Sequence, residues 1–157
     1  KYRLAMKVKI SNKARDPYTN DNVLSNWFWK VRQKELTGLS FIDYRSIAED
    51  ENLDNNFLTI REINTRHQYG IFKTFGGYVT QMKVGNTAKG KYARLVIENN
   101  YKLHKVIIWA SEYENFKDLL KGCEKRIVLF SAELKYDANY TKGNQFTFKE
   151  ESFLKVF

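Results

Sequence analysis

The chain has 157 residues, of which 43% are hydrophobic and 15% aromatic. A domain usually has about 100–200 residues, so the length excludes a second large domain, and the apolar content suits one folded core and not a disordered chain. The 27 Lys and Arg residues outnumber the 18 Asp and Glu residues and give a formal net charge of +9. This excess favours a polyanionic partner.

Compartment and membrane association are constrained by what the sequence lacks. No apolar run approaches the ~20 residues of a membrane-spanning helix, and the first residues do not have the pattern of a secretory signal. The one cysteine, Cys123, excludes an internal disulfide and suits a reducing compartment. We therefore expect a cytoplasmic protein with no membrane partner. Because the sequence starts with Lys1 and not with Met, we also expect a piece of a longer chain, monomeric in isolation.

Positive charge is concentrated in parts of the chain. Residues 1–34 carry nine basic and two acidic side chains, residues 35–66 carry three and seven, and residues 67–157 carry 15 and nine. The densest basic stretch has one acidic residue, Glu98, among Lys83, Lys89, Lys91, Arg94, Lys102 and Lys105. We expect an anion-binding surface to include this stretch.

The first 66 residues predict a strand and a helical lead-in. Apolar residues alternate with mostly basic ones from Lys1 to Ile10, which is the period of a half-buried strand. Asp21 is a candidate helix N-cap, and the helical spacing of apolar residues after it ends at Gly38. The acidic, Asn-rich residues that follow predict a short helix near residues 45–50 and a short strand or turn at 57–63.

The rest of the chain predicts five strands and one helix. Gly76 and Gly77 lie inside the first of these strands and predict a bulge or bend. Asn99 and Asn100 predict the hairpin turn between the second and third strands, and Ser111 is a candidate N-cap for the helix. The strands are expected at residues 72–84, 92–98, 103–109, 126–134 and 145–157.

Three strands, a helix and two further strands are arranged in the order of an OB-fold. This fold is a five-stranded, partly open barrel that binds oligonucleotides on strands 2 and 3 and on the loops between strands 1 and 2 and strands 4 and 5. We therefore predict a mainly β structure with some α. Residues 1–66 form the N-terminal strand and helical lead-in, and residues 67–157 form an OB-fold domain that binds nucleic acid.

Cations and aromatic residues converge on the surface where an OB-fold holds its ligand. Each stacked base contributes roughly 1–3 kcal/mol, and a basic groove follows the phosphates with strong salt dependence. These properties suit single-stranded nucleic acid. The candidate binding residues are Lys83, Lys89, Lys91, Tyr92, Arg94, Lys102, His104, Tyr136, Tyr140 and Lys142.

Several of these residues also have a simpler interpretation. Strand alternation places Arg94 on the opposite face from Leu95, so some of the cations could form only a solvated outer surface. Trp109 follows the apolar run Val106-Ile-Ile108, which favours a place in the core over a stacking role. Tyr140 lies between polar residues, which makes it a better candidate for stacking.

The sequence contains no recognisable catalytic or metal site. His67 and His104 lack a partner cysteine, which excludes a typical zinc site. Cys123 has no evident activating base, and the acidic residues 49–54 do not have the spacing of a calcium loop. No P-loop or catalytic triad pattern occurs. We expect no cofactor, no bound metal and no catalytic residue in this chain.

Five segments resemble the OB domain of DNA polymerase III alpha subunits, the replicative polymerases of bacteria and phages. They are Gln33-Lys-Glu-Leu-Thr-Gly-Leu-Ser40, Gly77-Tyr-Val-Thr-Gln-Met-Lys83, Thr87-Ala-Lys-Gly-Lys-Tyr-Ala-Arg-Leu-Val-Ile-Glu98, Val106-Ile-Ile-Trp109 and Tyr113-Glu-Asn-Phe-Lys-Asp-Leu-Leu120. The resemblance extends over roughly residues 30–157, and its most specific part is Lys89-Gly-Lys91 with the strand that follows. The His-Pro that usually follows the first segment in this family is missing, and Ile42-Asp-Tyr-Arg45 lies near its place. This difference indicates a divergent member of the family.

The resemblance implies a module without catalytic residues that holds the single-stranded template near the polymerase site of a nucleotidyltransferase, with other replisome proteins as partners. Lys89, Lys91, Tyr92 and Arg94 match the family's basic loop and strand. Two alternatives remain. A protein-interaction module would dock a replication partner through the barrel or the opening strand, and a nuclease would need clustered carboxylates, whereas Glu98 and Glu133 are scattered.

Overall fold

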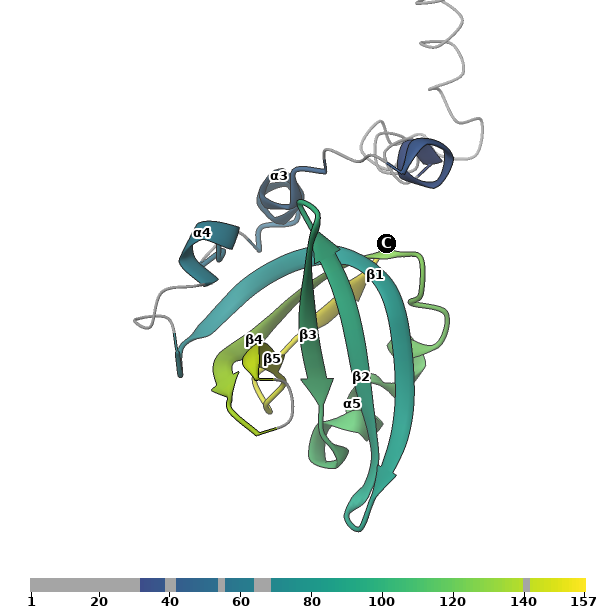
Figure 1. Ribbon diagram of the computed structural model, residues 1–157, viewed down its shortest axis with the longest axis vertical. Helices are drawn as coiled ribbons and strands as arrows, with labels where there is room; N and C mark the ends of the chain where they lie inside the picture. The colour runs from purple at the N-terminus through teal and green to yellow at the C-terminus, as the bar shows by residue number, and fades with distance from the viewer. Residues whose placement is uncertain (1–31, 39–41, 54–55, 64–68, 140–141) are drawn as a thin grey trace, which may run out of the picture. The chain divides into compact units, whose positions relative to one another are not determined.

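The computed structural model describes residues 32–38, 42–53, 56–63, 69–139 and 142–157 (Figure 1). The chain forms two compact units, Lys1–Ile42 and Asp43–Phe157. In the first unit, residues 32–37 are helical. Gly38 adopts φ 69°, and its N–H donates to the Lys34 carbonyl at 2.8 Å, so the helix ends where the glycine predicts. The predicted strand at residues 1–10 and the start of the predicted helix lie outside the described residues.

The second unit holds the sheet. Its helices and strands are α3 (Tyr44–Asp50), α4 (Ile60–Ile63), β1 (Phe72–Thr87), β2 (Gly90–Asn99), β3 (Lys102–Ile108), α5 (Ala110–Leu120), β4 (Ile127–Asp137), β5 (Gly143–Thr147) and β6 (Leu154–Val156). This unit therefore begins earlier than the expected OB domain at residue 67, because α3 and α4 belong to it.

The strands close into a barrel. They hydrogen-bond in the order β1-β2-β3-β5-β4, and β4 pairs with β1 to complete the ring. The β3–β5 pairing is parallel and the others in the ring are antiparallel. Five strands in this order, with a helix between the third and fourth, have the topology of an OB-fold. The sequence prediction of the fold class is confirmed.

A single long strand, β1, contributes to two sides of the barrel. Tyr78 is paired both with Glu98 of β2 and with Ile127 of β4, and the strand curves strongly across the molecule (Figure 1). Gly76 lies at this bend, where a Cβ atom would be 2.7 Å from the Leu129 side chain and 2.9 Å from Tyr44 Cβ. The missing side chain therefore lets α3 pack directly on the bend.

The inward-facing residues of the strands form the core. Phe75, Phe130 and Phe146 are fully buried, and the ring centroids of Phe75 and Phe146 are 4.8 Å apart. Phe116 of α5 meets Phe148 edge-on at 5.0 Å, which attaches the helix to the barrel. This core positions the outward-facing residues of β2 and β3 on a rigid support.

Three local features differ from the sequence expectation. The predicted strand 145–157 is interrupted, because the N–H of Lys149 bonds the Ser152 hydroxyl at 2.9 Å and turns the chain, so β5 and β6 pair successively with β4. The helix N-cap is Trp109 and not Ser111. The hairpin turn centres on Asn100 and Tyr101, with φ 47° and 63°, one residue later than predicted. Within the described residues, no helix is long and apolar enough to cross a membrane.

Candidate nucleic-acid interface

The outer face of β2 and β3 carries the candidate site. Ala93, Leu95 and Ile97 of β2 are fully buried, so alternation turns Tyr92 and Arg94 outward. On β3, Ile107 lies opposite Arg94. The strand period therefore places a ring, a guanidinium and an aliphatic side chain next to one another outside the barrel.

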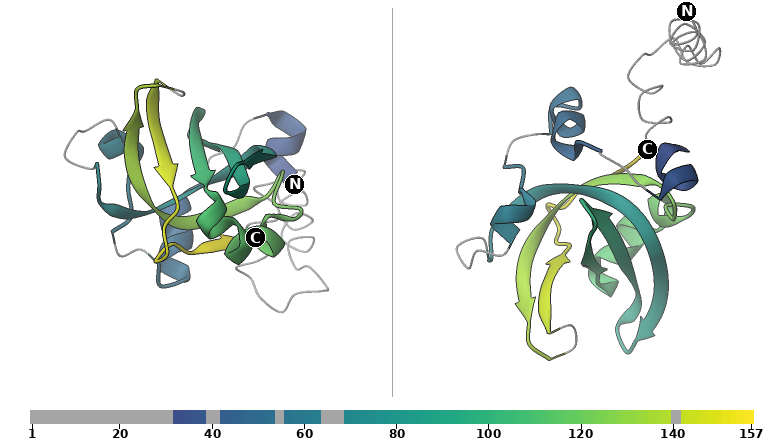
Figure 2. Two further views of the ribbon diagram at one scale, coloured as in Figure 1. Left: turned by 90° about the horizontal axis from the view of Figure 1, so that it is seen from below. Right: turned by 45° about the horizontal axis from the view of Figure 1, so that its top comes forward.

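A groove of about 340 Å³ lies on this face. Its walls come from the end of β1, from β2 and β3, and from the β4–β5 hairpin. Both the β1–β2 and β4–β5 hairpins project on the same side of the barrel (Figure 2, right). The lining residues are Asn86, Thr87, Tyr92, Arg94, Ile107, Trp109, Asp137 and Gln145.

Two aromatic rings form one end of the groove. The ring centroids of Tyr92 and Trp109 are 5.7 Å apart, with an interplanar angle of 35°. Trp109 is 43% exposed, although the apolar run before it favoured a core position. Alternation explains the difference, because Ile108 is fully buried and the next residue faces outward. Trp109 was not among the site residues predicted from the sequence. Because Val106 and Ile108 face the core and successive residues of a strand alternate, the sequence pattern does indicate that Trp109 faces outward.

The β1–β2 hairpin supplies the cations of the site. Lys83, Lys89, Lys91 and Arg94 are all exposed. Lys83 on β1 lies directly opposite Arg94 on β2, so the two side chains share one face of the sheet. Like charges in such a cross-strand pair destabilise the sheet. The structure thus brings four of the predicted residues together with Tyr92 on one hairpin.

Three other predicted residues lie elsewhere in the described part of the chain. Lys102 is at the opposite end of β3, in a separate pocket. Tyr136 is 58% exposed beside Tyr69, and alternation turns it away from Asp137, which lines the groove. Lys142 is an exposed residue of the β4–β5 connection. Tyr140 lies outside the described residues.

His104 does not face the predicted surface. Its ring packs inside the barrel, with its centroid 5.1 Å from that of Phe75 and 6.4 Å from that of Phe146. Burial, with the nearby charge of Lys102, lowers the pKa of His104 to about 4. The Nε2 atom is buried and has no hydrogen-bond partner among the described residues. His104 is thus a neutral core residue, and its position corrects the expectation that it contacts nucleic acid.

The surroundings of Cys123 keep its thiol in the neutral form. Burial raises the pKa of the Cys123 thiol to about 11, with a smaller contribution from Glu124, so the thiol stays protonated near neutral pH. Its sulfur lies 3.5 Å from that of Met82. Among the residues that the structure describes, no three His, Cys, Asp or Glu side chains gather as a metal site would require.

Comparisons with known proteins show similarity in structure. No protein-family model matches the sequence, and no curated protein sequence matches it significantly. Asparaginyl-tRNA synthetase from Pyrococcus horikoshii is 16% identical with a TM-score of 0.49, over 64% of this chain and 23% of the synthetase. A replication factor A related protein from Methanobacterium thermoautotrophicum is 18% identical with a TM-score of 0.47, over 64% of this chain and 90% of that one.

A HINb domain is 14% identical with a TM-score of 0.48, over 68% of this chain and 51% of that chain. This chain thus spans about half of the HINb structure and less than a quarter of the synthetase. At these identities and TM-scores, function does not follow from the similarity.

Proposed function

We propose that the barrel binds single-stranded DNA along the outer face of β2 and β3. The observation that carries this proposal is the aromatic pair of Tyr92 and Trp109 beside Arg94 in one groove. Bases stack on exposed aromatic rings, and a neighbouring guanidinium binds a phosphate through paired N–H donors. The groove thus offers both kinds of contact that a nucleotide makes.

The cations of the β1–β2 hairpin favour an anionic ligand. The opposed pair of Lys83 and Arg94 is unfavourable in the free protein, and a phosphate between the two side chains would relieve the repulsion. Lys89 and Lys91 extend the same positive field along the hairpin. Binding therefore depends on counterion release and weakens as salt rises.

The aromatic pair favours a single strand over a duplex. Stacking on Tyr92 or Trp109 requires a base whose face is free, and the faces of bases within a duplex are covered by neighbouring base pairs. Stacking is also tolerant of sequence, because every base has an aromatic face. We expect binding with little sequence preference.

The finer assignment is that the chain is the OB module of a divergent DNA polymerase III alpha subunit in the cytoplasm. It would hold template near the polymerase site and work beside other replisome proteins. The sequence segments that include Lys89-Gly-Lys91 support this proposal. Since no family model matches, the assignment depends on those segments alone. The opening strand invoked by the protein-docking alternative lies outside the described residues.

Fluorescence anisotropy with a labelled oligothymidine tests DNA binding. The affinity should fall steeply from low to physiological salt, and an unlabelled duplex should compete weakly. Trp109→Ala and Arg94→Ala should each weaken binding. Lys121→Ala is a matched control, because Lys121 is exposed at the far end of α5 and pairs with Asp118 at 2.7 Å. Binding that ignores salt, or that Trp109→Ala leaves unchanged, would contradict the proposal.

A further inference from the structure

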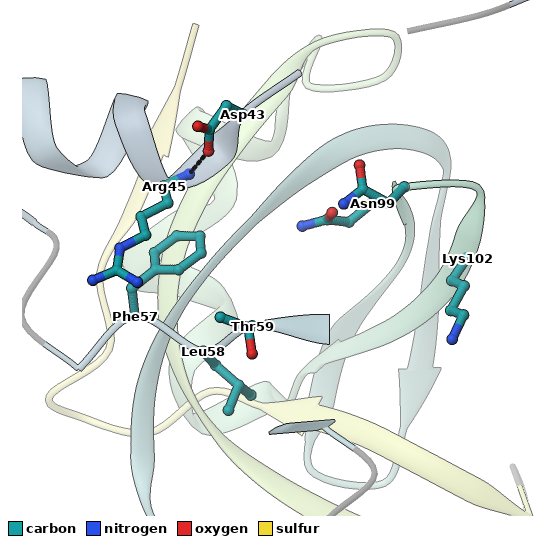
Figure 3. A pocket seen from close by; sticks show the side chains of 8 residues that line it. Asp43, Arg45, Phe57, Leu58, Thr59, Asn99 and Lys102 are labelled. Carbon is teal, nitrogen blue, oxygen red and sulfur yellow. Dashed lines mark hydrogen bonds between the residues drawn. The ribbon is translucent and has the colours of Figure 1, made fainter. Parts of the chain in front are cut away.

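A second pocket lies at the other end of the β2–β3 hairpin from the groove. It has a volume of about 750 Å³ and opens between the hairpin turn, the start of α3 and the segment before α4 (Figure 3). Its lining residues are Asp43, Arg45, Phe57, Leu58, Thr59, Asn99, Asn100 and Lys102.

Hydrogen bonds to backbone carbonyls hold the walls of this pocket in place. The Leu58 N–H donates to the Thr74 carbonyl at 2.8 Å, and the Thr74 N–H donates to the Asn56 carbonyl at 3.1 Å, so the segment runs beside β1. On the opposite wall, Asn99 Nδ2 donates to the Gly76 carbonyl at 2.8 Å. The pocket is therefore formed before any ligand arrives, which lowers the entropic cost of binding.

The charged groups of the pocket suit a phosphate. Arg45 and Lys102 contribute cations from two different elements. Arg45 is paired with Glu49 through its Nε atom at 3.2 Å, and a guanidinium has further N–H donors. The one carboxylate, Asp43, caps α3 by accepting from the N–H groups of Arg45 and Ser46 at 3.1 and 3.3 Å. The carboxylate of Asp43 is thus bound by backbone N–H groups at the start of α3.

The neutral groups of the pocket suit a nucleobase. Phe57 offers an aromatic ring that is not fully buried, and the exposed Asn100 carries an amide that can donate to and accept from a base edge. A ring for stacking, an amide for a base edge and cations for phosphate occur together in this pocket. These are the chemical requirements of one nucleotide.

The hairpin turn supports a ligand-binding role. Tyr101 adopts φ 63°, a conformation in which glycine is strongly preferred, and its side chain is 53% exposed. Strain of this kind persists where the surroundings or the function require it. An exposed aromatic residue in a strained turn, next to Lys102 of the pocket, is consistent with contact to a base.

The groove and the pocket lie at the two ends of the same pair of strands. From Arg94 to Asn99, β2 spans about 17 Å at ~3.4 Å per residue. Lys105 and Leu103 lie along the outer face of β3 between the two sites, and Leu103 is 65% exposed. A strand of DNA that leaves the groove along this face arrives at the hairpin turn. It then has to cross the turn at Tyr101 to enter the pocket, because the paired residues Asn99 and Lys102 share the opposite face with His104.

We propose that the pocket between Arg45 and Lys102 is a second nucleotide subsite, occupied by the far end of a single strand that also fills the groove. The inference rests on the proposed function. With this subsite, the DNA-binding interface consists of the groove and the pocket. Short oligonucleotides then bind in the groove alone, and longer ones also contact the pocket.

Oligothymidines of roughly 4 and roughly 16 nucleotides, the limits of OB-fold site sizes, test this inference by anisotropy. Phe57→Ala and Lys102→Ala should each weaken binding of the long oligonucleotide, Phe57→Ala by about fivefold or more, the effect of losing one stacked base. Binding of the short one should not change. Lys121→Ala is the control, and circular dichroism checks that Phe57→Ala is folded. Lys102→Ala removes an exposed side chain and does not affect the core.

A direct readout uses the same long oligonucleotide with a photoreactive 4-thiothymidine at either end. Crosslinks from one end should map to residues 56–59 or 100–102, and Lys102→Ala should reduce them. If both variants bind long and short oligonucleotides as the wild type does and these crosslinks are absent, the subsite is wrong while the groove still stands. If the wild type binds neither oligonucleotide, the proposed function itself fails.

Discussion

The ring of Tyr92 lies across Gly85 on the neighbouring strand. The two residues are paired in the β1–β2 ladder, and a Cβ atom on Gly85 would be 2.5 Å from Tyr92 Cε1. The bare backbone of β1 thus provides the surface on which the ring rests while its centroid stays 5.7 Å from that of Trp109. An aromatic side chain that packs over a glycine of the adjacent strand also helps to fix the register of the two strands.

Gly85→Ala should therefore displace the Tyr92 ring and weaken DNA binding. The new methyl group meets only the far end of a flexible side chain, so the free energy of unfolding should change by less than about 0.5 kcal/mol. Anisotropy measures the loss of affinity, and urea denaturation measures stability. Tyr92→Phe is the matched control, since it keeps the ring and should bind almost as the wild type does. Unchanged affinity in Gly85→Ala would show that the ring position is not important.

Lys83→Gln should have opposite effects on stability and on binding. It removes the like-charge pair with Arg94, which should raise the free energy of unfolding by about 0.2–1 kcal/mol. It also removes one phosphate contact, so affinity should fall and the slope of log K against log salt should become shallower by about 0.7, the value for one contact to a single strand. Titration at several salt concentrations measures this slope. A variant with lower stability and normal affinity would contradict the role given to the pair.

Tyr101→Gly should stabilise the protein. Glycine adopts positive φ without the steric cost of a Cβ atom, about 1–2 kcal/mol in this region, and Asn-Gly is a preferred type I′ turn. The free energy of unfolding in urea should rise by about 1 kcal/mol. If the exposed ring contacts DNA, affinity for the long oligonucleotide should fall in this more stable variant. Asn100→Gly is the comparison, because it relaxes the same turn and keeps the tyrosine.

The order of elements was predictable because amphipathic alternation is local. Buried residues such as Leu95 and Ile97 recur at period two along β2, which fixes both the strand and its outward face. The same parity, applied from Val106 and Ile108, turns His104 inward and Trp109 outward. The chemical type of His104 favoured a place on the binding surface, and the apolar run before Trp109 favoured a place in the core. For both residues the strand period decided the outcome.

The second pocket could not be predicted from local pattern. It depends on the segment at Phe57 pairing with Thr74 of β1 and on Tyr44, whose hydroxyl donates to the Glu98 carbonyl at 3.3 Å. Both contacts join residues that are distant in sequence, and in each contact one residue belongs to the acidic, irregular region before β1. Nothing in the sequence around Phe57 indicates that it will line a pocket together with Lys102.

The buried imidazole of His104 should make stability depend on pH. Its pKa in the folded protein is about 4, below the ordinary value of 6.5, mainly because burial disfavours the charged form. As the pH falls below 6.5, the unfolded chain takes up a proton that the folded protein does not, so stability is lost progressively down to pH 4 and is fully present above 6.5.

His104→Leu should remove this component of the pH dependence. Leucine fills the space beside Phe75 without the unpaired Nε2 atom, so the variant should also be more stable at neutral pH by about 1 kcal/mol, the lower end of the cost of a buried unsatisfied polar group. Urea denaturation of both proteins at several pH values gives the difference in unfolding free energy. That difference should grow in favour of the variant as the pH falls from 6.5 towards 4. A constant difference across this range would mean that His104 titrates normally in the folded protein and is open to water.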